Sequence, residues 1–484
     1  MEQVSGQTTP TQFDRLRSQH PKFTYDRFNF AHENGGIRAS FHFRLEPDIE
    51  FQPEILIQIP ASLNAVDSAK LENVVFHLGL VEMLSYWKAA CSPEIEIRAG
   101  SLKPDQIDWW TDLLRNGMGE FFYVNKIDPK RSDLVRITAT GGALPTVPGT
   151  VSPAQVKSQT AGETQSKRPL VLASGGKDTA LTLHFLKESG TAFDCLMLNP
   201  TRAATDLVLQ AKCPPPVVVS REIDKRLLQL NKEGYLNGHT PFSAYLSFLG
   251  VMNAVLFGHD YVIASNERSS NEGNVKFLNS QVNHQYSKSV DFEGKFRQYV
   301  SRYLTPAVEY FSLVRPLYEI QIMLLFSDYP EFFPVFRSCN RGQAQNAWCG
   351  VCPKCVCIFT LAHPFLSHGD LTGIFGRDLF QMESTVDMLK QLTGVAGQKP
   401  FECVGTLEET VAALHLSAAK LKKERRELPL ALRWAEKEAL PRYPDASVLA
   451  RRILSDWGNE NYLPPDYAER LKSKLKQKVA RLLD

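Results

Sequence analysis

The chain has 484 residues, 43% of them hydrophobic and 22% charged, which is typical of a globular protein of roughly two or three domains. Its 55 basic and 53 acidic residues nearly cancel, so the net charge gives no sign of a nucleic-acid-binding surface. The N-terminal segment mixes Gln, Thr, acids and Arg and has no apolar run of the kind that a secretory signal needs. We expect a cytoplasmic protein that binds neither nucleic acid nor a membrane.

Residues 1–140 have the pattern of an α+β domain. Apolar and polar residues alternate through 22–60, which predicts half-buried strands, and a helix is expected over 71–90. Residues 105–124 predict a helix that runs into a strand, and the segments EIEIRAG and LVRITAT predict further strands. No motif for a function is visible in this part of the chain.

Residues 141–167 are rich in Gly, Pro, Ser, Thr and Gln and predict a linker. Residues 168–375 then begin with a strand, a glycine turn, a helix and a second strand, followed by strands near 217–220 and 260–265. This order predicts an α/β domain with a parallel sheet. Within it, the apolar stretch 242–257 predicts a buried helix, since it is too short to cross a bilayer of about 30 Å. Residues 376–484 predict a mainly helical region with solvated charged faces.

The glycine turn SGGKDT lies where a buried strand meets a helix, which is a place that favours a bound anion. Two glycines allow close approach of a phosphate, two hydroxyls can donate to it, and an aspartate can serve a bound Mg²⁺. The spacing is not that of a Walker A loop, because Lys177 is followed by Asp178. The candidate ATP-binding residues here are Ser174, Gly175, Gly176, Lys177, Asp178 and Thr179.

This hexapeptide resembles the SGGxDS signature of the PP-loop, or N-type, ATP pyrophosphatases, with Thr179 in place of the last serine. The resemblance implies a doubly wound parallel sheet of the adenine nucleotide alpha hydrolase type, and cleavage of ATP to AMP and pyrophosphate. The alternative is structural, since a strand, a glycine turn and a helix begin many α/β units.

Five of the nine cysteines lie between Cys339 and Cys357. The spacing C-x9-C-x2-C-x2-C suits one closed, structural Zn²⁺ site rather than a catalytic one, with a redox pair or buried free thiols as alternatives. The expected ligands are Cys339, Cys349, Cys352 and Cys355, without Cys357. The segment SC…WCGxCxxC also resembles the zinc element of 7-cyano-7-deazaguanine synthases, which are PP-loop enzymes that activate a carboxylate.

A long polar segment, residues 264–297, follows the strand at 260–265. In open α/β sheets ligands bind beyond the carboxyl ends of the strands, so Asn266 and Glu267 are candidates to contact ATP or substrate. The other interpretation is a solvated surface loop.

The segments ERSSNEGN, VNHQYSKS, YFSLVRPLYE, FRSCNRG and PFECVGT together resemble the UDP-N-acetylmuramoyl-L-alanyl-L-glutamate epimerases, over roughly residues 170–406. The resemblance implies inversion of the terminal L-glutamate of a peptidoglycan precursor, dependent on ATP and Mg²⁺.

Such an inversion removes the Cα proton of glutamate, which a neighbouring carboxylate anion opposes. As an acyl-adenylate, the same carboxyl group can delocalise the carbanion. Proton transfer then needs two groups on opposite faces or one mobile group, and the candidates are His284, Lys288 and Cys403. The arginines that could bind the carboxylate or the UDP pyrophosphate are Arg268, Arg297, Arg315 and Arg341.

Three other functions share some of these features. A different carboxylate-adenylating enzyme would form an amide, nitrile or thio product, and a tRNA-modifying PP-loop protein would use its N-terminal domain or basic C-terminal helices to bind RNA. The third is a nucleotide-binding regulatory module without chemistry. The net charge of +2 argues against RNA binding, and the complete SGGKDT set argues against an inert module.

Overall fold

The computed structural model describes residues 11–33, 35–60, 71–142, 144 and 167–483. The predicted linker, 141–167, lies almost entirely outside these residues. Eleven strands form one central sheet, in the order β13-β10-β7-β8-β9-β4-β2-β1-β5-β6, with β3 paired to β2. The strands of this sheet are β1 (Lys22–Glu33), β2 (Gly36–Leu45), β3 (Ile49–Phe51), β4 (Glu54–Gln58), β5 (Glu94–Ile97), β6 (Arg136–Ala139), β7 (Pro169–Leu172), β8 (Asp194–Leu198), β9 (Val217–Glu222), β10 (Tyr261–Ala264) and β13 (Glu309–Ser312).

The five strands β13-β10-β7-β8-β9 are parallel. The chain runs outward from β7 through β8 to β9 and then returns to the other side of β7 for β10 and β13. The direction of winding therefore reverses between β7 and β10, and a crevice for a ligand forms at such a point, beyond the carboxyl ends of the strands. This confirms the expected α/β class with a mostly parallel sheet.

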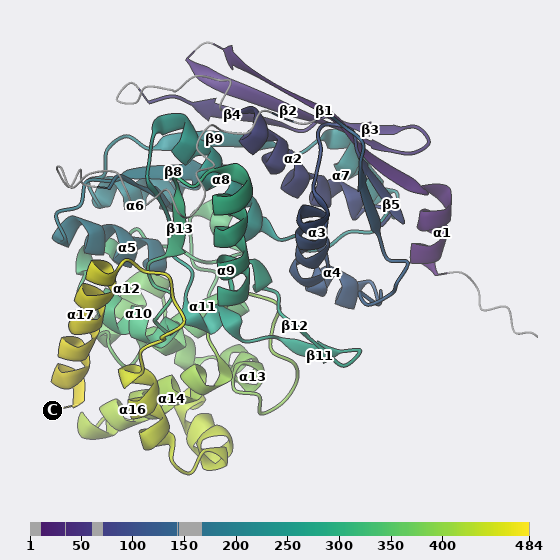
Figure 1. The fold of residues 1–484 in the computed structure, drawn as a ribbon. Coiled ribbons are helices and arrows are strands. Elements are labelled where there is room, and N and C mark those ends of the chain that lie inside the picture. The colour runs from purple at the N-terminus through teal and green to yellow at the C-terminus, as the bar shows by residue number, and fades with distance from the viewer. Residues whose placement is uncertain (1–10, 34, 61–70, 143, 145–166, 484) are drawn as a thin grey trace, which may run out of the picture.

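The N-terminal strands continue the same sheet. Strand β4 pairs antiparallel with β9, in a register that places Ile57 opposite Val219. Helix α2 (Glu72–Trp87) is buried on almost every side and packs on α8 (Phe242–Phe257), so the N-terminal segment shares one hydrophobic core with the parallel half (Figure 1). The segments that we predicted as two domains are thus joined by hydrogen bonds and by a common core.

Two sequence expectations about helices have different outcomes. The buried helix predicted at 242–257 is α8, with the same bounds. The strand predicted at the end of 105–124 is wrong, because α3 (Pro104–Gly117) is followed by a second helix, α4 (Gly119–Val124). Phe121 and Phe122 are fully buried, so helical packing overrides the strand propensity of this aromatic run.

The remaining helices cover the parallel strands and build the C-terminal region, as expected for residues 376–484 (Figure 1). A β-hairpin, β11 (Val275–Phe277) and β12 (Ser280–Val282), precedes α9. The other helices are α1 (Gln12–Gln19), α5 (Lys177–Glu188), α6 (Arg202–Gln210), α7 (Lys225–Lys232), α9 (Val290–Tyr299), α10 (Glu319–Phe326), α11 (Pro353–Ala362), α12 (His368–Phe375), α13 (Glu383–Leu392), α14 (Leu407–Lys423), α15 (Leu430–Trp434), α16 (Ala446–Ser455) and α17 (Pro465–Leu483). None of the described helices has the length and apolar character needed to cross a membrane.

Candidate active site

A cavity of about 640 Å³ opens at the point where the winding reverses. Its walls come from the ends of β7, β8 and β10 and from the segments around residues 284–288, 337–346 and 403. A cavity of this size and place is typical of a small-molecule site. Among the residues singled out from the sequence, those that line it are Ser174, Gly175, Gly176, Asp178, Thr179, Asn266, Glu267, His284, Lys288, Cys339 and Cys403.

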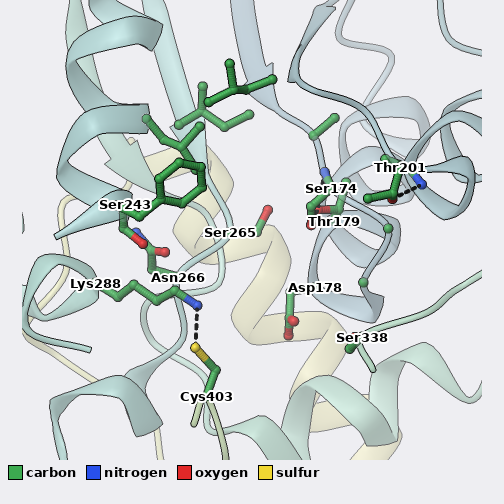
Figure 2. A pocket seen from close by; sticks show the side chains of 18 of the residues that line it. Ser174, Asp178, Thr179, Thr201, Ser243, Ser265, Asn266, Lys288, Ser338 and Cys403 are labelled. Atoms are coloured by element: carbon green, nitrogen blue, oxygen red, sulfur yellow. Dashed lines mark hydrogen bonds between the residues drawn. The ribbon is translucent and has the colours of Figure 1, made fainter. Parts of the chain in front are cut away.

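The glycine turn forms one wall of this cavity (Figure 2). The backbone N–H of Ser174 donates to Thr179 Oγ1 at 3.2 Å, and the two hydroxyl oxygens lie 2.9 Å apart, which closes the turn. Gly176 caps α5 in an extended conformation. A side chain at Gly175 would meet the Ala203 Cβ at 2.7 Å, so glycine is required for the turn to pack against α6. The first turn of α5, with its unpaired N–H groups and positive dipole end, therefore faces the cavity.

Lys177 occupies a different place from the one expected for a phosphate ligand. Its fully buried ammonium group binds Asp178 Oδ1 at 2.6 Å and the carboxylate of Glu319, and it is not part of the cavity wall. Burial alone would raise the pKa of Glu319, but the ammonium groups of Lys177 and Lys354 outweigh it and lower the pKa. Lys354 does line the cavity, 3.5 Å from Glu319, and sequence reasoning missed it.

Lys288 and Cys403, two of the residues predicted to transfer protons, lie on the opposite side of the cavity (Figure 2), and the third, His284, also lines it. Lys288 Nζ lies 3.3 Å from Cys403 Sγ. Burial would raise the pKa of the Cys403 thiol, but the Lys288 charge and a hydrogen bond with His284 lower it to about 7. Burial would lower the pKa of His284, but its bonds with Cys403 and Glu120 raise it to about 9. Contact with Lys288 and His284 therefore favours the thiolate form of Cys403.

Asn266 and Glu267 follow β10 closely and line the cavity, with Asn266 on the side of Lys288 (Figure 2). Asn266 Nδ2 donates to Ser312 Oγ at 3.2 Å. Glu267 is only 3% exposed, and burial raises its pKa. Both residues thus lie at the carboxyl end of β10, and their contact with a ligand stays a prediction.

The four arginines expected to bind anions do not line the cavity. Arg268 pairs with Asp456 at 2.8 Å, and Arg297 binds the backbone carbonyl of Tyr310. Arg315 is buried against Glu293. The arginines of the cavity wall are Arg221 and Arg337. Arg221 lies near the carboxyl end of β9, and this place at a strand end is the signal that could have identified it.

Arg315 instead supports the site from behind. Its guanidinium binds the Glu293 carboxylate at 2.8 Å and donates to the backbone carbonyls of Glu267, at 2.7 Å, and Lys288. It thereby fixes the backbone of two cavity residues to one another.

The four predicted cysteine ligands are brought together at the edge of the cavity. Cys339 Sγ is 3.9 Å from Cys352 Sγ, and Cys349 Sγ is 3.7 Å from Cys355 Sγ. All four sulfurs lie within 4.8 Å of one another, and tetrahedral Zn²⁺ with bonds of about 2.3 Å would place them about 3.8 Å apart. The cluster could hold a zinc ion. Cys357 lies outside it and accepts a hydrogen bond from the Gly405 N–H at 3.4 Å.

Comparisons with known proteins assign the chain to a family. Residues 14–313 match the family model described as the MurL N-terminal domain, and residues 335–444 match the MurL C-terminal domain. The chain belongs to the MurL family. Its cavity is built from both matched parts, since Cys403 lies in the second and the glycine turn in the first.

Three relatives carry the name UDP-N-acetyl-alpha-D-muramoyl-L-alanyl-L-glutamate epimerase. The protein from Salinispora tropica is 34% identical over 81% of this chain and 84% of its own length. The protein from a Micromonospora species is 31% identical over 93% of this chain and 97% of its own length. The protein from Xanthomonas oryzae is 29% identical over 75% of this chain and 78% of its own length.

Proposed function

We propose that this protein inverts the terminal L-glutamate of UDP-N-acetylmuramoyl-L-alanyl-L-glutamate to D-glutamate, in the synthesis of a peptidoglycan precursor. One observation carries the proposal: a glycine turn at a helix N-terminus and a cysteine in contact with a lysine face each other across one cavity. The first suits a nucleotide phosphate and the second suits proton abstraction from carbon. Membership of the MurL family supports the epimerase activity.

We further propose that ATP activates the glutamate α-carboxylate, as in PP-loop enzymes. The first turn of α5 would bind the phosphates, and the Asp178 carboxylate, which lines the cavity, would hold Mg²⁺. The carboxylate oxygen attacks the α-phosphorus, pyrophosphate leaves, and an acyl-adenylate forms. Mg²⁺ supplies charge neutralisation on the phosphates.

The activated carbonyl makes the Cα proton acidic enough for a thiolate to remove. The Cys403 thiolate takes this proton, and the resulting carbanion delocalises into the carbonyl of the acyl-adenylate. This carbonyl belongs to the former α-carboxylate, whose negative charge no longer opposes the carbanion. A solvent water then protonates the opposite face of Cα, and the hydroxide left behind hydrolyses the acyl-adenylate to AMP and the D-glutamyl product. Cys403 returns the proton that it took to the solvent. Lys288 and His284 keep Cys403 ionised before the step.

The structure suits a closed, structural role for the four-cysteine cluster. A Zn²⁺ held by four thiolates has no open position for substrate. The cluster instead orders the segment that carries Arg337 and Ser338, and the Arg337 N–H donates to the carbonyl of Gly175 at 2.7 Å. We propose that zinc stabilises the turn through this contact.

The decisive experiment is a reaction in D₂O with ATP, Mg²⁺ and the muramoyl dipeptide. AMP, together with one deuterium at the glutamate Cα, would support activation followed by epimerisation. AMP without deuterium would point to an amidating or sulfur-transferring enzyme. Deuterium without AMP would contradict the role of ATP. If neither AMP nor deuterium incorporation were detected, the proposed substrate would be wrong.

A further inference from the structure

Helix α4 of the N-terminal segment brings a carboxylate to the proton-transfer residues. Glu120, in the first turn of α4, accepts a hydrogen bond from His284 Nδ1. The side chains of His284 and Glu120 are only 16% and 18% exposed, so solvent screens their interaction weakly. With Nδ1 bound to Glu120, Nε2 is the ring nitrogen left to contact Cys403. The three residues thus form a series in the order carboxylate, imidazole and thiol.

The backbone around His284 is fixed together with the segment that carries Cys403. The His284 N–H donates to Asn274 Oδ1 at 2.9 Å, and Asn274 Nδ2 donates to the carbonyl of Pro400 at 2.7 Å. Asn274, which directly precedes β11, therefore links the backbone at His284 to the segment that carries Cys403. The hydrogen bond to Glu120 then fixes the rotation of the His284 ring and favours its charged form.

A second histidine lies beside this series. The His239 ring packs on the His284 ring with 4.3 Å between centroids, and its Nδ1 is 3.8 Å from the Glu120 carboxylate. Burial and the charge of His284 lower the pKa of His239 to about 4, whereas the pKa of His284 is raised to about 9. Glu120 binds one of the two rings directly, and that ring is the one that carries the proton. The ionisable groups that act on His239, His284, Lys288 and Cys403, besides these four residues themselves, are Glu120, Lys88, Lys354 and Glu267.

We propose that Glu120 is a positioning residue for proton transfer: by accepting the hydrogen bond of His284 Nδ1 it orients the ring and directs Nε2 toward Cys403. The N-terminal segment therefore completes the catalytic site. This proposal rests on the proposed function, in which Cys403 removes the Cα proton. The arrangement parallels the general rule that an acid or base acting next to a nucleophile is itself oriented by a third group.

The same three side chains, Glu120, His239 and His284, have donor atoms close enough to hold a metal ion. A direct hydrogen bond between His284 Nδ1 and Glu120 satisfies both atoms without an ion. The geometry therefore favours the proton series, and metal binding is the rival outcome of the test.

The test measures the ionisation of Cys403 in the full-length zinc-loaded protein without substrate. Alkylation by iodoacetamide is followed against pH by mass spectrometry of the peptide that contains Cys403. In Glu120→Gln we expect alkylation at pH 6.5 to slow about tenfold, which corresponds to one pKa unit. Glu120→Asp should restore most of the rate. Glu94→Gln, which removes an ion-paired carboxylate from β5 of the same segment, should behave as wild type.

Kinetics supply the second measurement. Glu120→Gln should lower kcat about a hundredfold with little change in KM, within the usual range for acid–base catalysis. An unchanged alkylation profile in Glu120→Gln would overturn the proposal, and so would a second bound metal ion that this variant loses. If wild-type protein formed no AMP with the dipeptide, the proposed function would fail, while the alkylation profile would still decide the role of Glu120.

Discussion

Lys288 Nζ lies 3.3 Å from Cys403 Sγ, although 115 residues separate them in the chain. Both line the cavity, on the side opposite Ser174, Asp178 and Thr179 (Figure 2). A lysine in direct contact with a cysteine stabilises the thiolate, the form that can act as a base.

Replacement of Cys403 should separate the two halves of the reaction. In Cys403→Ser we expect Cα deuterium exchange to fall by about a hundredfold or more, because a hydroxyl is a far weaker base than a thiolate. Exchange of pyrophosphate into ATP in the presence of the dipeptide should continue, since the glycine turn is untouched. Cys213→Ser, outside the cavity wall, is the matched control. Loss of both activities in Cys403→Ser alone would assign Cys403 to activation rather than to proton transfer.

The pH dependence of kcat/KM should be bell-shaped. Activity needs Cys403 ionised and His284 protonated, and their pKa values are about 7 and about 9. Activity should therefore rise as pH increases through about 7 and fall as it increases through about 9. Because Cys403 and His284 interact, the two apparent pKa values of this profile belong to the pair and not to either residue alone. Initial rates at subsaturating dipeptide test this. A profile that is flat between pH 6 and 8 would exclude Cys403 as the base.

Gly175→Ala should weaken the packing of the turn. The new Cβ would meet the Ala203 Cβ at 2.7 Å and backbone atoms at 3.0 Å, and overpacking of this kind destabilises by about 1–3 kcal/mol. The KM for ATP should rise as well, because the turn must shift. Gly373→Ala, at an exposed position of α12 with open space around its Cβ, should instead stabilise by up to about 1 kcal/mol. Urea unfolding compares the two, and equal stabilities would disprove the close packing.

The cysteine cluster should hold one zinc ion per chain. Cys349→Ser should lose the metal and much of the soluble protein, because it removes one of the four sulfurs that we expect to hold the ion. Metal analysis of purified protein measures this, with Cys213→Ser again as the control. Zinc-free wild-type protein that tolerates Cys349→Ser would refute the structural-metal assignment.

Arg315→Ala should destabilise the fold by about 3–5 kcal/mol, because it leaves the buried carboxylate of Glu293 without its charged partner. The double variant Arg315→Met with Glu293→Gln should recover part of this loss, since it removes both charges. Chemical denaturation provides the free energies of unfolding. If the single variant were as stable as wild type, the pair would not hold the backbone of Glu267 and Lys288.

Local patterns in the sequence were sufficient to predict several elements of the fold and the residues that line much of the cavity. The strand, turn and helix around Ser174, the bounds of α8 and the clustering of the four cysteines all follow from residue types at fixed short spacings. These features depend on hydrogen bonds and packing between near neighbours, so the order of residues determines them. The family resemblance also rests on such short segments, and the family models confirm it.

The tertiary structure alone decided which distant residues meet. Pairing of β4 with β9 joins the N-terminal strands to the parallel sheet, and Lys177 turns inward to Glu319. Glu120 reaches His284 only because residues 119–124 fold as a helix, where the sequence predicted a strand. In each case the outcome depends on burial and charge pairing between segments more than a hundred residues apart, and no short-range pattern in the sequence records such contacts.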